Sequence, residues 1–364
     1  MTPRSLDPVA LDRAFAVARG LVDDGTLPFA ILGIANAAGT VRLEAVSAPE
    51  HAAVDVNSVC LLASITKPIV ATAVVRLAAE GRFSLQEPLA RWLPELGDDA
   101  NRSRITAWHV LTHTSGLEDV DTAPLLLRGA AREELLAQVL AQPSSAAPGA
   151  RFEYASHTFD LLAVALERGL GTPLEALLQE TVLGPLGMHD TCFDPTLDPE
   201  LASRLAPVAV GPWDPMIPPA AVADPAVAAA LVRSYRSLRM AGGGLSSTAD
   251  DLLRFGRAML RGGELDGRRV LGPVFVDLMT RETTVGGIGA AADPLDAHHY
   301  ALGWGKPAPH DPASPSAFGH SGASCTRLWI DPAHDLVVVF LGGSWGRPTR
   351  LMDPIVDAVY AAVR

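Results

Sequence analysis

Apolar and polar positions along the first eighty residues follow two different periods. Apolar residues recur at helical spacing over about residues 8–23, which predicts an amphipathic helix. Two apolar runs follow, FAILGIAN and TVRLEAVSA, and Ala37-Ala38-Gly39 joins them, which predicts a β-hairpin. A long helical pattern then covers about residues 64–80 and stops at Gly81.

The middle of the chain is dominated by helical periodicity. Residues from about 84 to 187 carry repeated Leu/Ala spacing, as in REELLAQVLAQ and FDLLAVALERGL, and predict a mainly helical region. The stretch 207–225 contains six prolines, so we expect it to form a long irregular loop. Long loops are often functional, so this segment is a candidate rim of a site.

The pattern of apolar and polar positions changes again in the last 130 residues. GGGLSSTADDLLRFGRAML predicts a glycine turn and a helix capped by Ser246 or Ser247. Short predicted strands follow in YALGWG, SAFGHSG, TRLWID and LVVVFLGG, and MDPIVDAVYAAVR predicts a closing helix. Strands at both ends with helices between them predict an α/β (α+β) fold. We expect a discontinuous sheet lobe from residues 1–83 and 235–364, and a helical lobe from 84–234.

Composition narrows the class of protein. The formal net charge of −12, from 29 basic and 41 acidic residues, gives no basic footprint for nucleic acid. The first twenty residues carry several charges, and no run of 18 apolar residues is free of charge or proline, so we expect neither an export leader nor a membrane span. Three widely spaced cysteines favour reduced thiols. We therefore expect a soluble, cytoplasmic protein.

Lysine is rare in this chain. Of the 29 basic residues only Lys67 and Lys306 are lysines. Lys67 belongs to Ser64-Ile65-Thr66-Lys67, an S-x-x-K pattern at the start of the predicted long helix, and this spacing puts both side chains on one helix face. A serine hydroxyl needs a neighbouring base to become a good nucleophile, and a lysine amine can lose its proton whereas arginine cannot.

Two further segments give this pattern a context. Tyr154-Ala155-Ser156 precedes a predicted helix, and His320-Ser321-Gly322 lies on a short predicted strand. With Ser64-x-x-Lys67 they resemble, in the expected order, the three motifs of the serine β-lactamase and penicillin-binding-protein superfamily. The class C-like branch, which includes family VIII carboxylesterases and D-amino-acid peptidases, is the most similar. VLTHTSGL, GGGLSSTADDLLRFG, YALGWG and WIDPAHDLVVVF also resemble that branch, so the likeness runs from about residue 28 to the end.

The resemblance implies a fold and a set of roles. The fold would be the β-lactamase/transpeptidase type, an antiparallel sheet flanked by helices with a helical lobe beside it. Ser64 would be the acylated nucleophile, and Lys67 and Tyr154 would share proton transfer. The backbone N–H groups of Ser64 and Ala323 would form the oxyanion hole. The other substrate-binding positions implied by the resemblance are Ser156, His320, Ser321 and Gly322.

Two departures from the β-lactamase pattern point to the substrate. Ser156 stands where those enzymes usually have asparagine, and His320-Ser321-Gly322 stands where they usually have Lys-Thr-Gly. A histidine at the third motif offers a weaker permanent charge and resembles the esterase and D-peptidase members, and its imidazole is expected to hydrogen-bond the Tyr154 oxygen. We therefore predict a carboxylesterase for short-chain acyl esters that needs no cofactor and takes a small-molecule ester or amide. A D-amino-acid amidase or peptidase, a β-lactamase-like amide hydrolase, an acyltransferase and a non-catalytic binding protein of the same fold stay open.

Other motifs favour plainer interpretations. Gly342-Gly343-Ser344-Trp345-Gly346 matches G-x-S-x-G, but no histidine follows it, so an α/β-hydrolase triad cannot be completed. The segment 287–292 resembles a dinucleotide fingerprint without the strand and helix that such a site requires. His109 and His113 lack the glutamate of a zinc protease and are expected to make structural hydrogen bonds.

The adjacent histidines and the tryptophans of the chain also have plain interpretations. His298 and His299 are adjacent and lack neighbouring ligands, so no metal site is predicted. Trp304, Trp329 and Trp345 are expected in the core, with one or two of them lining an acyl pocket, and Trp213 is the weaker candidate for that pocket.

Overall fold

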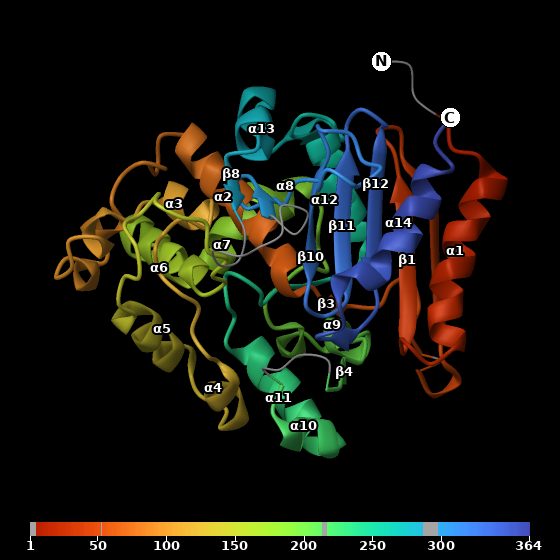
Figure 1. The fold of residues 1–364 in the computed structure, drawn as a ribbon, viewed down its shortest axis with the longest axis horizontal. Helices are drawn as coiled ribbons and strands as arrows, with labels where there is room; N and C mark the ends of the chain where they lie inside the picture. Colours follow the sequence, from red (N-terminus) through yellow and green to blue (C-terminus); the bar gives the residue numbers. More distant parts are fainter. Residues whose placement is uncertain (1–4, 52, 213–216, 287–297) are drawn as a thin grey trace.

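The centre of the molecule is a five-stranded antiparallel sheet in the order β10-β11-β12-β1-β2 (Figure 1). The computed structural model describes residues 5–51, 53–212, 217–286 and 298–364. The strands are β1 (Phe29–Ala35), β2 (Thr40–Ser47), β10 (Phe318–Gly322), β11 (Thr326–Asp331) and β12 (Leu336–Leu341). The first hairpin therefore pairs with the last strands of the chain, which confirms a sheet built from both ends.

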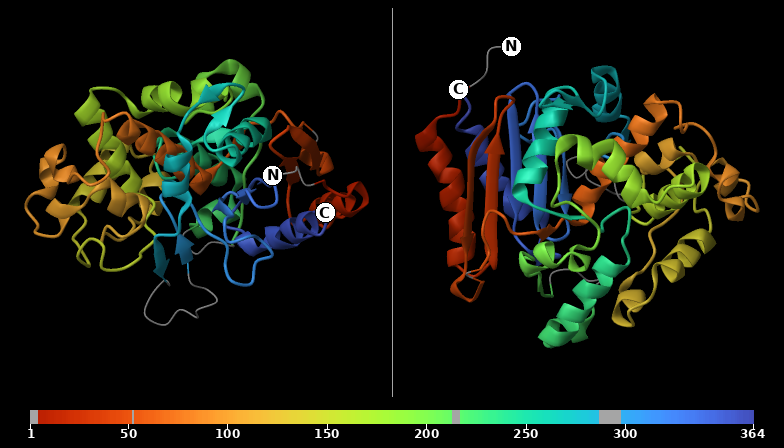
Figure 2. Two further views of the ribbon diagram at one scale, coloured as in Figure 1. Left: turned by 90° about the horizontal axis from the view of Figure 1, so that it is seen from above. Right: turned by 180° about the vertical axis from the view of Figure 1, so that it is seen from behind.

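Alternation along β1 gives the sheet two buried faces. Ala30, Leu32 and Ile34 pack in one core with the helices α1 (Pro8–Asp23) and α14 (Asp353–Tyr360), while Phe29 and Ile31 belong to the larger core on the other face. Every residue of β1 is buried, as expected for a strand covered on both sides. Figure 2 shows α1 and α14 along the outer side of the sheet. The site predicted from the sequence therefore lies away from these two helices, in the larger core.

The helix α12 (Ala249–Leu260) covers the inner face of the sheet, where Gly256 permits close packing. A Cβ at this glycine would lie 2.5 Å from Val337 Cγ1. The remaining helices lie mainly on the side of the molecule opposite α1 (Figure 1). They are α2 (Thr66–Ala79), α3 (Ala107–Leu111), α4 (Ala123–Leu127), α5 (Arg132–Ala141), α6 (Thr158–Leu170), α7 (Leu174–Leu178), α8 (Gly184–Leu186), α9 (Pro199–Ser203), α10 (Pro219–Ala223), α11 (Pro225–Ser237) and α13 (Pro273–Thr280). The boundaries of the two lobes at residues 83 and 235 stay a prediction.

Short paired strands complete the fold around this frame. They are β3 (Cys60–Leu61) with β5 (Ser246–Ser247), β4 (Ala209–Val210) with β13 (Ser344–Trp345), β6 (Glu264–Leu265) with β7 (Arg268–Arg269), and β8 (Thr284–Gly286) with β9 (His298–Tyr300). Within the described residues, none of the helices is long and apolar enough to cross a bilayer.

Three details differ from the sequence predictions. The long helix begins at Thr66, because Ala63–Ile65 form a separate 3₁₀ turn before it. Part of the proline-rich stretch is helical, since α10 starts with Pro219 in the first turn, where a proline costs no helix hydrogen bond. Ser246 and Ser247 do not cap α12; they pair with β3, and the Thr248 hydroxyl accepts from the Asp251 amide instead.

The predicted strand YALGWG is also shorter than expected. Only Tyr300 of this segment belongs to β9, and Gly303 adopts a φ of +76°, which turns the chain out of the strand. A Cβ at Gly303 would lie 2.5 Å from Ala71 Cβ, so a glycine here lets the turn pack directly on α2. The turn that follows Tyr300 therefore lies directly against α2, the helix that follows Ser64.

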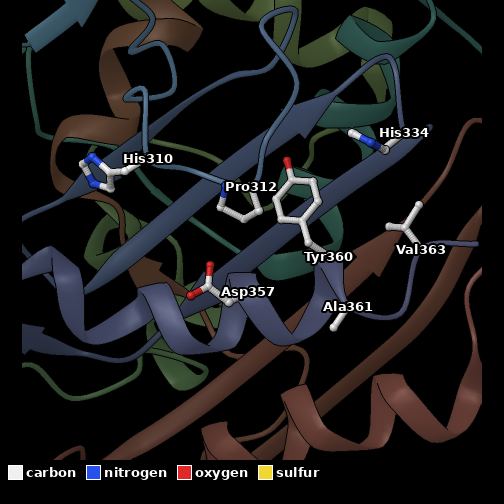
Figure 3. Close-up of a pocket in the computed structure, with 7 residues that line it drawn as sticks. All are labelled: His310, Pro312, His334, Asp357, Tyr360, Ala361 and Val363. Carbon is white, nitrogen blue, oxygen red and sulfur yellow. The ribbon is translucent and has the colours of Figure 1, made fainter. Parts of the chain in front are cut away.

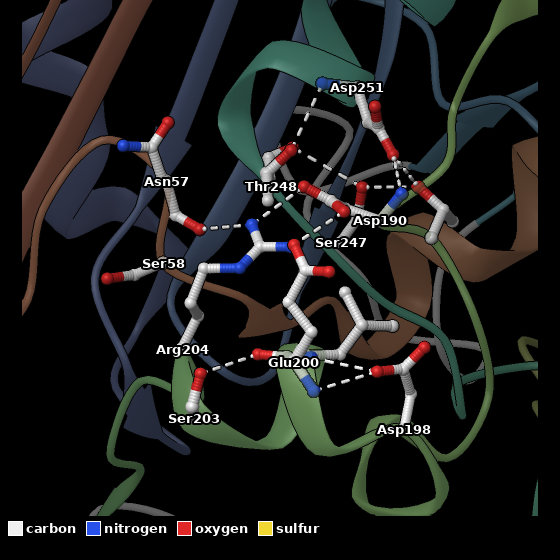
Figure 4. A network of polar contacts seen from close by, with 12 residues as sticks. Asn57, Ser58, Asp190, Asp198, Glu200, Ser203, Arg204, Ser247, Thr248 and Asp251 are labelled. Carbon is white, nitrogen blue, oxygen red and sulfur yellow. Dashed lines mark hydrogen bonds and ion pairs between the residues drawn. The ribbon is translucent and has the colours of Figure 1, made fainter.

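A polar network outside the sheet holds the segment between α8 and β4 (Figure 4). Arg204 donates two hydrogen bonds to the Asp190 carboxylate, at 2.7 and 2.8 Å, and a third to the Asn57 carbonyl at 3.0 Å. Thr191 donates to Asp251 of α12 at 2.7 Å, and the Asp190 amide donates to the same carboxylate oxygen. These bonds tie the segment to α12 and to the chain before β3.

An open cavity of about 580 Å³ lies on the α14 side of the sheet (Figure 3). Its lining residues come from α14, the β11–β12 turn and the loop before β10: His310, Pro312, His334, Asp357, Tyr360, Ala361 and Val363. None of them belongs to the three segments that the sequence singles out for chemistry. The cavity is therefore separate from the site that the three segments form.

Candidate active site

Ser64 lies in a strained turn at the entrance to α2. The preceding Ala63 adopts a φ of +49°, in the left-handed region that costs a non-glycine residue about 1 kcal/mol. The 3₁₀ turn Ala63–Ile65 lets the chain leave β3 and enter α2 within a few residues. Amides in the first turn of a helix have no partner within it. The role of the Ser64 N–H as an oxyanion donor stays a prediction.

Lys67 is fully buried one helical turn after Ser64. Its Nζ lies 3.1 Å from Ser64 Oγ, 3.0 Å from Ser156 Oγ and 2.7 Å from the Gly242 carbonyl oxygen. All three contacts are to uncharged oxygen atoms. The structure thus brings together Ser64, Lys67 and Ser156, as the motif spacing predicts.

Three oxygen atoms accept hydrogen bonds from Lys67 Nζ: Ser64 Oγ, Ser156 Oγ and the Gly242 carbonyl oxygen. A lysine amine that has given up a proton keeps two N–H donors and gains one lone pair. The Gly242 carbonyl can only accept, so the 3.1 Å contact with the Ser64 hydroxyl is one along which a proton can pass to the lysine. This arrangement is suited to general-base activation of Ser64.

The Gly242 carbonyl is held by a tightly packed turn. A Cβ on Gly242 would lie 2.2 Å from the Ser156 carbonyl oxygen, so only glycine lets the turn approach the second motif this closely. The neighbouring Ala241 amide donates a hydrogen bond of 2.9 Å to Asp160 Oδ1 on α6. Burial raises the pKa of Asp160 to about 6. Sequence reasoning identified neither Gly242 nor Asp160, because their contacts depend on the meeting of distant segments.

Tyr154 packs between the lysine and a histidine. The Lys67 Nζ lies 4.8 Å from the centre of the Tyr154 ring, and the His113 ring centre lies 4.3 Å from it on a tilted plane. The Ala155 amide donates to His113 Nδ1 at 3.2 Å, and the Glu153 amide donates to the His113 carbonyl at 2.7 Å. The expected structural role of His113 is therefore confirmed, since it supports the backbone on both sides of Tyr154.

The third motif runs directly against the turn that carries Ser64. A Cβ on Gly322 would lie 2.1 Å from the Leu62 carbonyl oxygen. Ser324 Oγ donates to the Leu61 carbonyl at 2.6 Å, and Thr326 Oγ1 donates to the Leu62 carbonyl at 2.8 Å. These contacts fix the end of β10 beside Ser64. Ala323, the predicted second oxyanion donor, follows Gly322 and is half-buried at this junction.

His320 has a hydrogen-bond partner that the sequence did not suggest. Its Nε2 lies 3.0 Å from the hydroxyl oxygen of Tyr300, and its Nδ1 lies 2.8 Å from the Ser321 carbonyl oxygen. The His320 and Tyr154 ring centres are 6.2 Å apart. Tyr300 lies in YALGWG, one of the segments that carry the family resemblance, but that likeness assigned it no role.

The Ser321 side chain lies on the opposite face of β10. Its hydroxyl accepts a hydrogen bond of 3.2 Å from Arg327 Nε, and Arg327 forms an ion pair of 2.7 Å with Asp353 at the start of α14. Neighbouring residues of a strand alternate between faces, so His320 and Gly322 face the site while Ser321 faces α14. A substrate contact through the Ser321 hydroxyl stays a prediction that this orientation opposes.

An ion pair supports the helix that follows the second motif. His157 Nδ1 lies 2.5 Å from Asp119 Oδ1, which also accepts from the His157 amide at 2.9 Å. Burial raises the pKa of the Asp119 carboxyl, but the bonds and charge of His157 outweigh it and lower this pKa to about 2. Burial lowers the pKa of His157, but Asp119 outweighs it and the net shift is upward. Each partner of the pair therefore favours the charged form of the other.

Most rival motifs have structural roles. Ser344 is fully buried in β13, so the G-x-S-x-G match does not present an exposed nucleophile. His109 Nδ1 accepts from the Thr106 amide at 3.2 Å, which confirms its structural role. His299 Nδ1 lies 3.2 Å from Glu282. The segment 287–292 and Trp213 lie outside the described residues.

The three tryptophans expected in the core differ in their surroundings. Trp304 is fully buried and stacks on Phe255, while Trp329 donates to Tyr360 on the α14 side. Trp345 packs edge-on against Tyr235, whose hydroxyl donates to the Gly243 carbonyl at 3.2 Å. Of the three, Trp345 therefore lies beside the turn that contacts Lys67.

Comparison with known proteins agrees with this geometry. The family model described as Beta-lactamase matches residues 16–362. Protein Rv1367c of Mycobacterium tuberculosis is 31% identical over 330 residues, which cover 77% of this chain and 76% of that protein. Esterase EstB of Burkholderia gladioli is 39% identical over 153 residues, which cover 36% of this chain and 38% of EstB.

A solved structure gives the same fold. EstCE1, described as a hydrolase with promiscuous acyltransferase activity, superimposes with a TM-score of 0.78 at 23% identity and covers 97% of this chain and 99% of its own. The fold and the three converging motifs define a β-lactamase/transpeptidase-like protein. The chain belongs to the Beta-lactamase family.

Proposed function

We propose that this protein is a serine hydrolase that forms an acyl-enzyme on Ser64, and that it is a carboxylesterase for short-chain acyl esters. The observation that carries the proposal is the set of three contacts at Lys67 Nζ, with Ser64 Oγ at 3.1 Å. It places the amine of a buried lysine within hydrogen-bond distance of a hydroxyl in the turn before α2. The esterase relative EstB supports the choice of an ester over a β-lactam.

The chemistry follows from the placement of these groups. Ser64 Oγ attacks the ester carbonyl carbon while its proton passes to Lys67 Nζ, and the Ser64 and Ala323 amides hold the resulting oxyanion. When the tetrahedral intermediate collapses, the bond to the alcohol breaks and the alcohol oxygen takes a proton through Lys67 or Tyr154. Water then attacks the acyl-enzyme, losing its proton to the same groups, and Ser64 is released with the carboxylic acid.

A cavity beside the second motif offers room for a substrate. It encloses about 660 Å³, within the range typical of small-molecule sites. His157, next to Ser156, lines one side, and α4 and the start of α10 contribute the apolar part. The full lining is Asp119, Val120, Asp121, Thr122, Ala123, Pro124, Leu127, His157, Ile217, Pro218 and Pro219. Since none of Ser64, Lys67, Tyr154 and Ser156 lines it, the cavity borders the second motif and does not by itself define the ester position.

Active-site labelling tests the proposal. Treatment with a fluorophosphonate probe and mass spectrometry should find one adduct, on the peptide that contains Ser64. The variant Ser64→Ala should lose both the adduct and the hydrolysis of p-nitrophenyl butyrate. Ser344→Ala serves as the matched control and should keep both. Labelling that persists in Ser64→Ala, or an adduct on Ser344, would refute the assignment.

Two other reactions use the same acyl-enzyme and are separated by product analysis. The description of EstCE1 as a promiscuous acyltransferase makes transfer to an alcohol the second candidate. Adding a primary alcohol to the assay would then yield a new ester and not only the free acid. An amidase or peptidase would turn over D-aminoacyl amides faster than the matching nitrophenyl esters.

A further inference from the structure

Four rings from separate segments meet around the proposed base. His113 lies 4.3 Å from Tyr154 and 4.8 Å from Tyr300, and Tyr300 lies 5.9 Å from His320, measured between ring centres. Tyr300 comes from β9 and is 4% exposed, while His320 comes from β10. The cluster thus links the third motif to Tyr154 through a tyrosine that the proposed mechanism does not use.

The hydrogen bonds of His320 assign its tautomer. The Ser321 carbonyl oxygen can only accept, so the Nδ1 atom at 2.8 Å must carry the proton. In a neutral imidazole Nε2 then has a lone pair, and the Tyr300 hydroxyl at 3.0 Å donates to it. The hydroxyl and the carbonyl contact opposite sides of the ring, so together they fix its rotation.

The hydroxyl of Tyr300 is suited to this donor role. Burial, and then the nearby Tyr154, raise the pKa of Tyr300 well above its ordinary value. The phenol therefore keeps its proton over the whole working range of an esterase. Tyr154 packs against Lys67, whereas the Tyr300 hydroxyl bonds to the third motif.

We infer that Tyr300 is a positioning residue for the proposed hydrolysis: its hydroxyl fixes His320 in the Nδ1–H tautomer and in one orientation beside Tyr154. This inference rests on the function proposed above. Without the hydroxyl the imidazole loses the hydrogen bond at Nε2 and is held less firmly about its χ2 bond. A loss of one hydrogen bond is worth about 1 kcal/mol, or roughly five- to tenfold in a rate that depends on the ring orientation.

A double-mutant cycle tests the inference. Tyr300→Phe removes the hydroxyl and keeps the ring cluster, and His320→Ala removes the residue that Tyr300 is proposed to orient. We expect Tyr300→Phe to lower kcat for p-nitrophenyl butyrate about five- to tenfold with little change in KM. In the His320→Ala background the same change should have almost no further effect on kcat.

The matched control is Tyr360→Phe. The Tyr360 hydroxyl donates to Asp331 and accepts from Trp329, both at 2.9 Å, on the α14 side of the sheet, so its removal costs two hydrogen bonds away from the site. Its effect on thermal stability should be at least as large as that of Tyr300→Phe, while kcat should stay within about twofold in both backgrounds.

The outcomes separate this inference from the proposed function. An unchanged kcat in Tyr300→Phe overturns the inference, and so does a loss that persists undiminished in His320→Ala. Hydrolysis that survives in Ser64→Ala instead overturns the proposed function, whatever the cycle shows.

Discussion

The Ser156 hydroxyl oxygen lies 3.0 Å from Lys67 Nζ, although 89 residues separate the two in the sequence. This contact makes the second motif a direct partner of the proposed base. With the Gly242 carbonyl at 2.7 Å and Ser64 Oγ at 3.1 Å it surrounds Nζ with three oxygen acceptors. The orientation of the amine is therefore set by residues from three separate parts of the chain.

Replacing Ser156 should leave the amine of Lys67 less firmly oriented. In Ser156→Ala one N–H of Lys67 loses its acceptor inside a buried site, which costs about 1 kcal/mol or more. We expect kcat to fall roughly five- to tenfold and the fold to persist. Steady-state kinetics with p-nitrophenyl butyrate measure the fall in kcat, and circular dichroism checks that the fold persists. A rate equal to that of the wild type would mean that Ser156 does not orient the lysine.

Lys67→Arg tests whether the lysine must lose its proton. A guanidinium keeps its charge at all working pH values and cannot accept the Ser64 proton. We therefore expect kcat to fall by about 10³-fold or more. Because Lys67 is fully buried, Lys67→Met should accompany it as a control for packing, since it removes the base at a similar side-chain length. Substantial turnover in the arginine variant would show that deprotonation of residue 67 is unnecessary.

Gly322 should tolerate no side chain. A Cβ there would lie 2.1 Å from the Leu62 carbonyl oxygen and 2.3 Å from Thr326 Oγ1, and the first of these is backbone. Gly322→Ala should push β10 away from the Ser64 turn, lowering kcat and costing about 1–3 kcal/mol of unfolding free energy. Urea unfolding and esterase assays measure the two effects.

A second glycine serves as the control for Gly322. A Cβ on Gly20, within α1, meets nothing within 4 Å. Gly20→Ala should therefore keep full activity and stabilise the protein by about 0.5–1 kcal/mol. If both alanine variants behave alike, the close approach of β10 to Leu62 is not what positions the nucleophile.

The Asp119–His157 pair predicts how stability depends on pH. The pKa of Asp119 is lowered, so its contribution is complete above the unfolded pKa of about 3.9 and is lost as the pH falls toward about 2. The pKa of His157 is raised, so its contribution is complete below about 6.5 and is lost as the pH rises through the folded value. Between these limits the pair stabilises the folded state fully.

Thermal unfolding from pH 3 to pH 9 measures this dependence. The wild type should exceed Asp119→Asn and His157→Gln in Tm by about 2 °C near pH 5, and the difference should shrink toward both ends of the range. A constant difference across the range would show that the effect is steric and not ionic.

The helices and strands with a clear periodic pattern of apolar residues were predicted from the sequence. The helix over residues 8–23, the first hairpin and the strands β10, β11 and β12 are as predicted. The proline-rich stretch was less well predicted, because prolines at the first turn of a helix look the same in a sequence as prolines in a loop. Ser246 and Ser247 were assigned to a cap because β3, their pairing partner, lies almost 190 residues earlier.

The sequence by itself identified the family and predicted the type of chemistry. The S-x-x-K spacing predicts Ser64 and Lys67 within one turn of each other, and their Oγ and Nζ atoms do lie 3.1 Å apart, although Ser64 belongs to the 3₁₀ turn that precedes α2. The order of the three motifs identified the family. Lys67 is one of only two lysines among 29 basic residues, and unlike arginine a lysine can give up its proton.

Only the tertiary structure decided which groups surround that pair. The Gly242 carbonyl on Lys67, the Asp160 anchor of the same turn and the Tyr300 hydroxyl on His320 all join residues far apart in the sequence. No periodicity encodes such contacts, since they arise where the sheet, the helices and the loops between them pack against one another. The direction in which a side chain faces, as at Ser321, likewise depended on the strand register, which the pairing of whole strands sets.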